Sequence, residues 1–153
     1  MKASHSRQDL QPTESSFHWP VRVYYEDTDG GGVVYHANYL KFMERARTEW
    51  LRQLGFEQTE LREQTGVLFV VRGLRMHYIR PACFNDELLV VTRLVKVGRS
   101  LLEFGQDIFR NEGGQTEQLT QSMVEVVCVE SSRFKPVSIP DSIRTVIKTM
   151  EPA

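Results

Sequence analysis

Residues 38–54 read NYLKFMERARTEWLRQL, and this stretch has the clearest helical pattern in the chain. Its apolar side chains recur at steps of three and four, so they form one stripe along a helix. The stripe consists of Tyr39, Phe42, Met43, Ala46, Trp50 and Leu54. We expect Asn38 to cap the start of the helix and Gly55 to end it. Arg47 falls within the apolar arc, where it is either a paired structural charge or a functional group.

Strands are predicted on both sides of this helix from their β-branched and aromatic content. They span residues 21–25, 67–78, 87–97, 101–110 and 116–130. A polar connector at residues 57–66 follows the long helix, and a short helix is expected at residues 141–150. One long helix beside five strands predicts an α+β fold in which an antiparallel sheet curls around the helix. Because such a sheet leaves an edge strand and an open face, we expect a homo-oligomer.

The composition is that of one ordinary domain. The chain has 153 residues, of which 19 are basic, 20 are acidic and 41% are hydrophobic. This balance excludes global disorder and gives no electrostatic basis for binding nucleic acid or an anionic membrane. No apolar run approaches the roughly 20 residues that span a bilayer, and residues 1–16 are polar and lack the apolar central stretch of a signal peptide. We expect a polar tail at residues 1–16, a single domain at residues 17–153 and a cytoplasmic protein.

The stretch DTDGGG at residues 27–32 separates the first strand from the long helix. A calcium loop needs an oxygen ligand at its fifth position and Glu at its twelfth, where this chain has Gly31 and Asn38. A dinucleotide fingerprint would place its third glycine at Tyr35, so this interpretation fails as well. The pattern that fits is a glycine turn that delivers a carboxylate to a helix start. The alternative is that Asp29 only caps the turn.

Such a turn has a definite chemical use. Amides at a helix start have no intrahelical partner and carry the positive end of the helix dipole, so they can stabilise an oxyanion. A nearby carboxylate can act as a base toward water or as a nucleophile, and glycines let a substrate approach the backbone. The residues along this approach are Asp29, Gly32, Val33, Val34 and His36. His36 and the preceding Tyr25 either take part in this chemistry or are structural.

Other catalytic patterns fail. Ser132–Lys135 fits a Ser-x-x-Lys pattern, but its companion motifs are absent from the sequence. The two cysteines, Cys83 and Cys128, are too few for a disulfide scaffold or a metal cluster, and Cys128 is expected to be a small buried hydrophobe. Arginines in the strand region are solvated surface or, if they converge, ligands for the phosphates of coenzyme A. They are Arg72, Arg75, Arg80, Arg93 and Arg99.

Residues 24–47, YYEDTDGGGVVYHANYLKFMERAR, closely resemble the signature of hotdog-fold acyl-CoA thioesterases of the hydroxybenzoyl-CoA thioesterase type. Within that group the stretch is most similar to the Tol-Pal-associated acyl-CoA thioesterases of Gram-negative bacteria. The resemblance extends over roughly residues 21–140. It implies a hotdog fold, which is an antiparallel five-stranded sheet wrapped around one long central helix.

The resemblance also implies roles for individual residues. Asp29 matches the family's catalytic carboxylate, Tyr25 and His36 match the residues that accompany it, and the amide at His36 lies where the family polarises the thioester carbonyl. Gly32 and Val33 are expected to bind substrate. Arg99 and Ser100 match a turn near the coenzyme A phosphates in the hydroxybenzoyl enzyme, although the two residues before them are not basic.

We therefore predict hydrolysis of acyl-CoA to a carboxylic acid and CoA, with Asp29 as base or nucleophile. No metal or prosthetic group is expected, because a thioester is already activated. Pockets at subunit interfaces in the family imply a homodimer or homotetramer.

Two other functions stay open as alternatives. One is hydration or dehydration of an acyl thioester, although such enzymes carry a differently placed His–Asp or His–Glu pair. The other is a non-catalytic adaptor that binds acyl carrier protein or envelope proteins of the Tol-Pal system. The sequence also leaves open which acyl group is hydrolysed and whether its carrier is CoA or acyl carrier protein. It leaves open as well whether the protein attaches peripherally to the inner membrane. Phe42, Met43 and Trp50 are expected to be core rather than pocket wall.

Overall fold

The computed structural model describes residues 16–151 of the chain. Its strands are β1 (Ser16–Arg22), β2 (Val67–Tyr78), β3 (Glu87–Val97), β4 (Leu101–Glu112) and β5 (Gln115–Glu130). Its helices are the 3-10 turn η1 (Tyr25–Asp27), α2 (Asn38–Gln53), α3 (Gln58–Thr65), α4 (Asp141–Ile147) and the 3-10 turn η2 (Lys148–Met150). None of these helices is long and apolar enough to cross a membrane.

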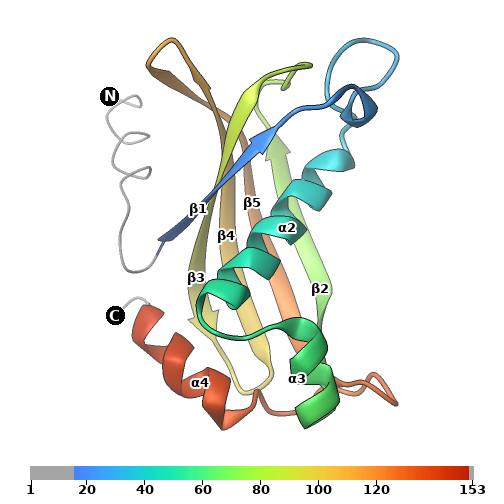
Figure 1. Ribbon diagram of the computed structural model, residues 1–153, viewed down its shortest axis with the longest axis vertical. Helices are drawn as coiled ribbons and strands as arrows, with labels where there is room; N and C mark the ends of the chain where they lie inside the picture. Colours follow the sequence, from blue (N-terminus) through green and yellow to red (C-terminus); the bar gives the residue numbers. More distant parts are fainter. Residues whose placement is uncertain (1–15, 152–153) are drawn as a thin grey trace.

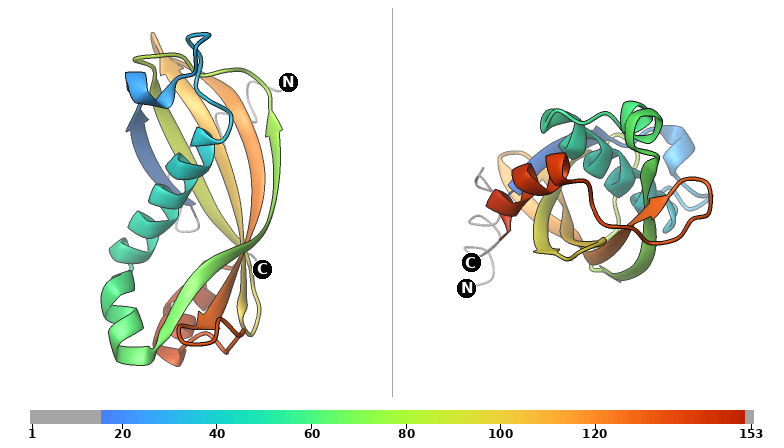
Figure 2. Two further views of the ribbon diagram at one scale, coloured as in Figure 1. Left: turned by 90° about the vertical axis from the view of Figure 1, so that its right-hand side faces the viewer. Right: turned by 90° about the horizontal axis from the view of Figure 1, so that it is seen from below.

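The strands form one antiparallel sheet in the order β1-β3-β4-β5-β2. The long helix α2 crosses one face of this sheet, and the strands curve around it when the molecule is seen from one end (Figure 1, Figure 2). Shifts in register occur in β2, β3 and β5, and such bulges increase the local twist and bend of a strand. The predicted α+β hotdog fold is confirmed.

The apolar stripe of α2 packs into the core as predicted. Phe42 is fully buried, Met43 and Tyr39 nearly so, and the Trp50 ring meets Phe104 of β4 edge to face at 5.2 Å. Phe42 and Met43 are therefore core residues, whereas Trp50 both packs in the core and lines a cavity described below.

Two elements differ from the sequence-based prediction. The connector at residues 57–66 contains the helix α3, because Glu57 accepts a hydrogen bond from the Glu60 amide at its start and Gly66 ends it in the left-handed region at φ 71°. Only Leu61 of this helix is buried, so its sequence shows no apolar stripe. The first strand is Ser16–Arg22 rather than residues 21–25.

The end of β1 is fixed by its pairing with β3 rather than by its own composition. Ser16 pairs with Arg93, and Arg22 pairs with Glu87. The side chains of Arg22 and Glu87 also form an ion pair. Beyond Arg22 the chain turns into η1. Ser16 belonged to the predicted tail, and the other residues of that tail lie outside the described part of the chain.

The core position of Phe42 yields a stability prediction. Replacing Phe42 by Ala removes a fully buried ring and leaves a cavity, so we expect the free energy of unfolding to fall by about 3–5 kcal/mol in urea denaturation. Leu40→Ala is the matched control on the same helix, since Leu40 is 37% exposed, and it should cost about 0.5 kcal/mol or less. Equal effects of the two substitutions would contradict this packing.

The two cysteines are expected to differ in reactivity. Burial raises the pKa of Cys128 to about 11, whereas Cys83 is exposed. The thiolate is the reacting form, so iodoacetamide at pH 8 should label Cys83 alone in the native protein and both cysteines after unfolding. Mass spectrometry of tryptic peptides measures this. Equal labelling of both residues in the native protein would contradict the buried position of Cys128.

Candidate active site

The glycine-rich segment folds into a closed turn that presents Asp29 on the surface. The Asp29 amide donates to the Val33 carbonyl at 2.9 Å, and Thr28 pairs with Val34 across the base of the turn. The Asp29 Oδ1 atom accepts a hydrogen bond from the Gly31 amide at 2.7 Å. Within the described residues Oδ2 has no hydrogen-bond partner, so one carboxylate oxygen is anchored and the other is open.

The neighbouring acid, Asp27, holds the turn in place. It is only 8% exposed, and its carboxylate accepts from the Tyr24 amide at 2.8 Å and from Asn38 Nδ2 at 2.6 Å. Its carbonyl accepts from the Tyr35 amide at 3.0 Å. Asp27 thus ties the end of the first strand segment to the start of α2.

This arrangement corrects the predicted role of Asn38. Ala37 occupies the cap position of α2 and makes no side-chain cap, while Asn38 is the first helical residue and is buried against Asp27. The sequence signal for this pair is the first acid of Asp-Thr-Asp, Asp27, to which the sequence-based prediction assigned no role.

The start of α2 carries an open backbone donor. The His36 amide has no acceptor within residues 16–151, whereas the Asn38 amide is already bonded to the Tyr35 carbonyl at 2.8 Å. The His36 carbonyl accepts from the Tyr78 hydroxyl at 2.8 Å, which holds the backbone on the C-terminal side of this amide against the end of β2. An amide held in this way at a helix N-terminus can stabilise an oxyanion.

Aromatic side chains surround this helix start. The His36 ring lies 4.6 Å from the Tyr35 ring and 6.5 Å from the Tyr78 ring, between ring centroids. His36, Tyr39 and Tyr78 line a cavity of about 260 Å³. Tyr25 is not a core residue, because it is 79% exposed and touches Phe84 edge to face at 5.8 Å.

The loop before β3 is hydrogen-bonded to the glycine-rich turn and to α2. The Val34 amide donates to the Ala82 carbonyl at 2.8 Å, and the Ala82 amide donates to the Tyr39 hydroxyl at 3.0 Å. Arg110 of β4 donates to Asp86 at 2.8 Å and to the Pro81 carbonyl at 3.0 Å, and it also pairs with Glu117. The hydrogen bonds that Arg110 donates to Asp86 and to Glu117 raise its pKa, so this arginine is permanently charged.

Arg99 and Ser100 lie at the other end of the sheet. Their turn joins β3 to β4 at the bottom of Figure 1, whereas the Asp29 turn is at the top. Arg99 Nε donates to the Ser138 hydroxyl at 2.8 Å. A single chain therefore does not bring these two residues to Asp29. The other strand arginines do not converge either, since Arg72, Arg80 and Arg93 pair with separate acids.

Arg47 is paired, although not with an acid. Its Nη1 donates to Gln106 Oε1 at 2.8 Å, and no carboxylate of the described chain lies within 4.0 Å of its guanidinium.

Residues 16–151 contain no cluster of three or more His, Cys, Asp or Glu side chains that could hold a metal ion.

Comparisons with known proteins identify the family of this chain. Residues 31–117 match the sequence model of the thioesterase superfamily. The acyl-CoA thioesterase YbgC of Haemophilus influenzae is 45% identical over 131 residues, which cover 86% of this chain and 93% of that protein. The chain belongs to the thioesterase superfamily. The sequence-based prediction of a thioesterase is confirmed, while the Tol-Pal subgroup stays a prediction.

Solved structures of thioesterases share the fold. A probable thioesterase from Bartonella henselae superimposes with a TM-score of 0.75 at 34% identity, covering 82% of this chain and 100% of that chain. A 4-hydroxybenzoyl CoA thioesterase from Pseudomonas sp. strain CBS-3 superimposes with a TM-score of 0.80 at 16% identity, covering 86% of this chain and 99% of that chain. The second likeness supports the hotdog fold alone.

The buried pair formed by Asp27 and Asn38 yields a prediction. Asn38→Ala removes a donor from a buried carboxylate, so we expect the free energy of unfolding to fall by about 1.5–3 kcal/mol. Asn111→Ala is the control, because Asn111 is exposed and its side chain lies 3.4 Å from its nearest partner, Thr116. It should cost about 0.5 kcal/mol or less. Urea denaturation measures both, and an Asn38→Ala protein of wild-type stability would contradict the role assigned to this pair.

Proposed function

We propose that the protein hydrolyses acyl-CoA thioesters to a free carboxylic acid and CoA at the turn formed by residues 27–36. The observation that carries this proposal is that one turn and helix start hold two open groups, the Asp29 Oδ2 atom and the His36 amide, seven residues apart in the sequence. A thioester carbonyl between them would have an attacking group on one side and an oxyanion donor on the other. Membership in the thioesterase superfamily supports the same reaction.

Asp29 acts by one of two routes. As a general base, its Oδ2 takes a proton from water while the water oxygen bonds to the carbonyl carbon; the tetrahedral intermediate then expels CoA as a thiolate. As a nucleophile, Oδ2 itself bonds to the carbonyl carbon and expels the thiolate, and water then hydrolyses the mixed anhydride. In both routes negative charge develops on the carbonyl oxygen, where the His36 amide stabilises it.

The remaining predicted site residues have supporting roles. The ring of His36 and the exposed Tyr25 orient the carboxylate or the attacking water. Gly32 adopts a φ of 85° that other residues rarely tolerate, and with Val33 it gives a thioester close access to the backbone. No metal or prosthetic group takes part in either route.

A second copy of the chain completes the site. The strand β2 is an edge of the sheet, and it exposes Val71 and Leu74 at 52% and 40%. Antiparallel pairing of β2 with β2 of a second copy would bring the opposite end of the partner toward the Asp29 turn. The partner's Arg99 and Ser100 would then lie on the same side as this turn, in the positions expected for ligands of the CoA phosphates. A homodimer, or a homotetramer built from two such dimers, follows.

The test is the release of free thiol from a panel of short, long and aromatic acyl-CoAs. We expect Asp29→Ala to lose at least about 100-fold in kcat, which is the scale of a lost general base or nucleophile. Glu26→Ala is the matched control, because Glu26 is an exposed acid of the adjacent η1 turn, and it should retain wild-type activity.

Two results would contradict the proposal. One is a folded Asp29→Ala protein with full activity. The other is a wild-type protein that hydrolyses neither acyl-CoA nor acyl carrier protein thioesters, which would favour an adaptor that binds acyl carrier protein or envelope proteins.

A further inference from the structure

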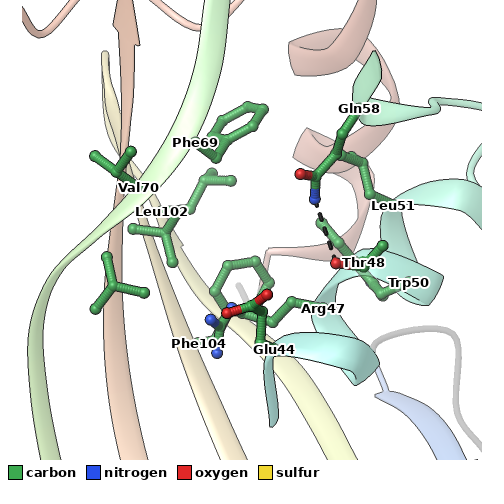
Figure 3. A pocket seen from close by; sticks show the side chains of 12 residues that line it. Glu44, Arg47, Thr48, Trp50, Leu51, Gln58, Phe69, Val70, Leu102 and Phe104 are labelled. Carbon is green, nitrogen blue, oxygen red and sulfur yellow. Dashed lines mark hydrogen bonds between the residues drawn. The ribbon is translucent and has the colours of Figure 1, made fainter. Parts of the chain in front are cut away.

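A cavity of about 400 Å³ lies between α2 and the part of the sheet formed by β2, β4 and β5 (Figure 3). The start of α2 contacts the end of β2, but the helix then diverges from this strand, and α3 closes the gap at the far end (Figure 1, Figure 2). The sheet side of the cavity is apolar and includes Phe69, Leu102 and Phe104. The helix side carries polar groups from α2 and α3.

This cavity and the catalytic end lie along the same side of α2. The smaller cavity at His36 is bounded by the start of α2 and the end of β2, and the larger one by the later turns of α2 and the first half of β2. Glu44, the first residue of α2 that lines the larger cavity, is six residues beyond Asn38, about 9 Å along the helix axis. A group bound at the helix start therefore has an unfilled space one to two turns further along.

Arg47 distinguishes this cavity from an ordinary gap in a core. Its side chain reaches from α2 toward the sheet (Figure 3), and burial lowers its pKa, although an arginine stays charged at neutral pH. Its acceptor, Gln106, is fully buried and held by its own donations to the Met43 carbonyl at 3.0 Å and the Thr92 hydroxyl at 2.9 Å. That interaction uses one of five guanidinium N–H groups.

The negative charge of Glu44, on the same helix side of the cavity, limits which ligand groups Arg47 can bind. Glu44 lines the cavity and interacts electrostatically with Arg47, but it lies beyond ion-pair distance. A carboxylate on the ligand would meet this negative charge. A purely aliphatic ligand would cover guanidinium donors without supplying an acceptor, which costs free energy. The cavity therefore suits a group that is mostly apolar and carries an uncharged oxygen.

We propose that this cavity binds the distal part of the acyl group, and that Arg47 donates to a hydroxyl or keto oxygen there, so that the preferred substrates are oxygenated acyl thioesters. The inference rests on the proposed thioesterase function. The volume lies within the range of small-molecule pockets. Thr48 and Gln58, hydrogen-bonded to each other at 3.4 Å, form the rim between α2 and α3 (Figure 3).

The test compares kcat/KM for ω-hydroxyacyl-CoAs of increasing length with that for alkanoyl-CoAs of the same number of heavy atoms. The wild-type protein should favour the hydroxylated member by about tenfold at one or more lengths, the scale of a hydrogen bond to a charged donor. Dicarboxylic acyl-CoAs of matched size should show no such advantage. A ratio of one or less at every length, or a preference for the carboxylate, would overturn the proposal.

Variants of α2 link this ratio to Arg47. Arg47→Met should bring the ratio close to one, while Arg45→Met, an exposed arginine outside the cavity, should keep the wild-type ratio. Arg47→Lys retains a charged donor and should keep part of the preference, which guards against a Met variant that fails to fold. An unchanged ratio in folded Arg47→Met would contradict the assignment. Absence of turnover with every acyl-CoA would instead contradict the proposed function.

Discussion

The buried carboxylate of Asp27 is the constraint on which the candidate site depends. It joins the Tyr24 amide, just after the first strand, to the side chain of Asn38, the first residue of α2. A carboxylate that is 8% exposed is costly to bury unless its lone pairs are satisfied, and both oxygens here accept a hydrogen bond. The entry angle of α2 and the path of the turn are set together by this one side chain.

The two ends of α2 differ in how they pack against β2. At its start, the Tyr78 hydroxyl holds the His36 carbonyl, and the loop before β3 holds the Val34 amide. Further along, the helix leaves β2, and the space between them stays unfilled in the single chain. The proposed catalytic groups at the start of α2 and the proposed acyl cavity beside its later turns are therefore separate parts of one helix.

The sequence predicted those helices and strands whose apolar residues recur at a regular spacing. The three-and-four spacing of α2 and the β-rich runs of β2 and β3 gave the observed bounds to within a residue, because burial of one face dictates their periodicity. The helix α3 escaped prediction since it buries only Leu61, and β1 was misplaced since its extent depends on pairing with β3. The pairing of Asp27 with Asn38 and that of Arg47 with Gln106 involve contacts between segments, which no spacing rule reveals.

The central claim is that Asp29 and the His36 amide act on the same carbonyl group. A crystal structure with an unreactive acyl-CoA analogue, in which a methylene replaces the thioester sulfur, tests it most directly. The account predicts the carbonyl oxygen about 2.7–3.1 Å from the His36 nitrogen. It also predicts Asp29 Oδ2 about 3–3.5 Å from the carbonyl carbon, or one water away from it. A carbonyl bound beyond the reach of both groups would contradict the account.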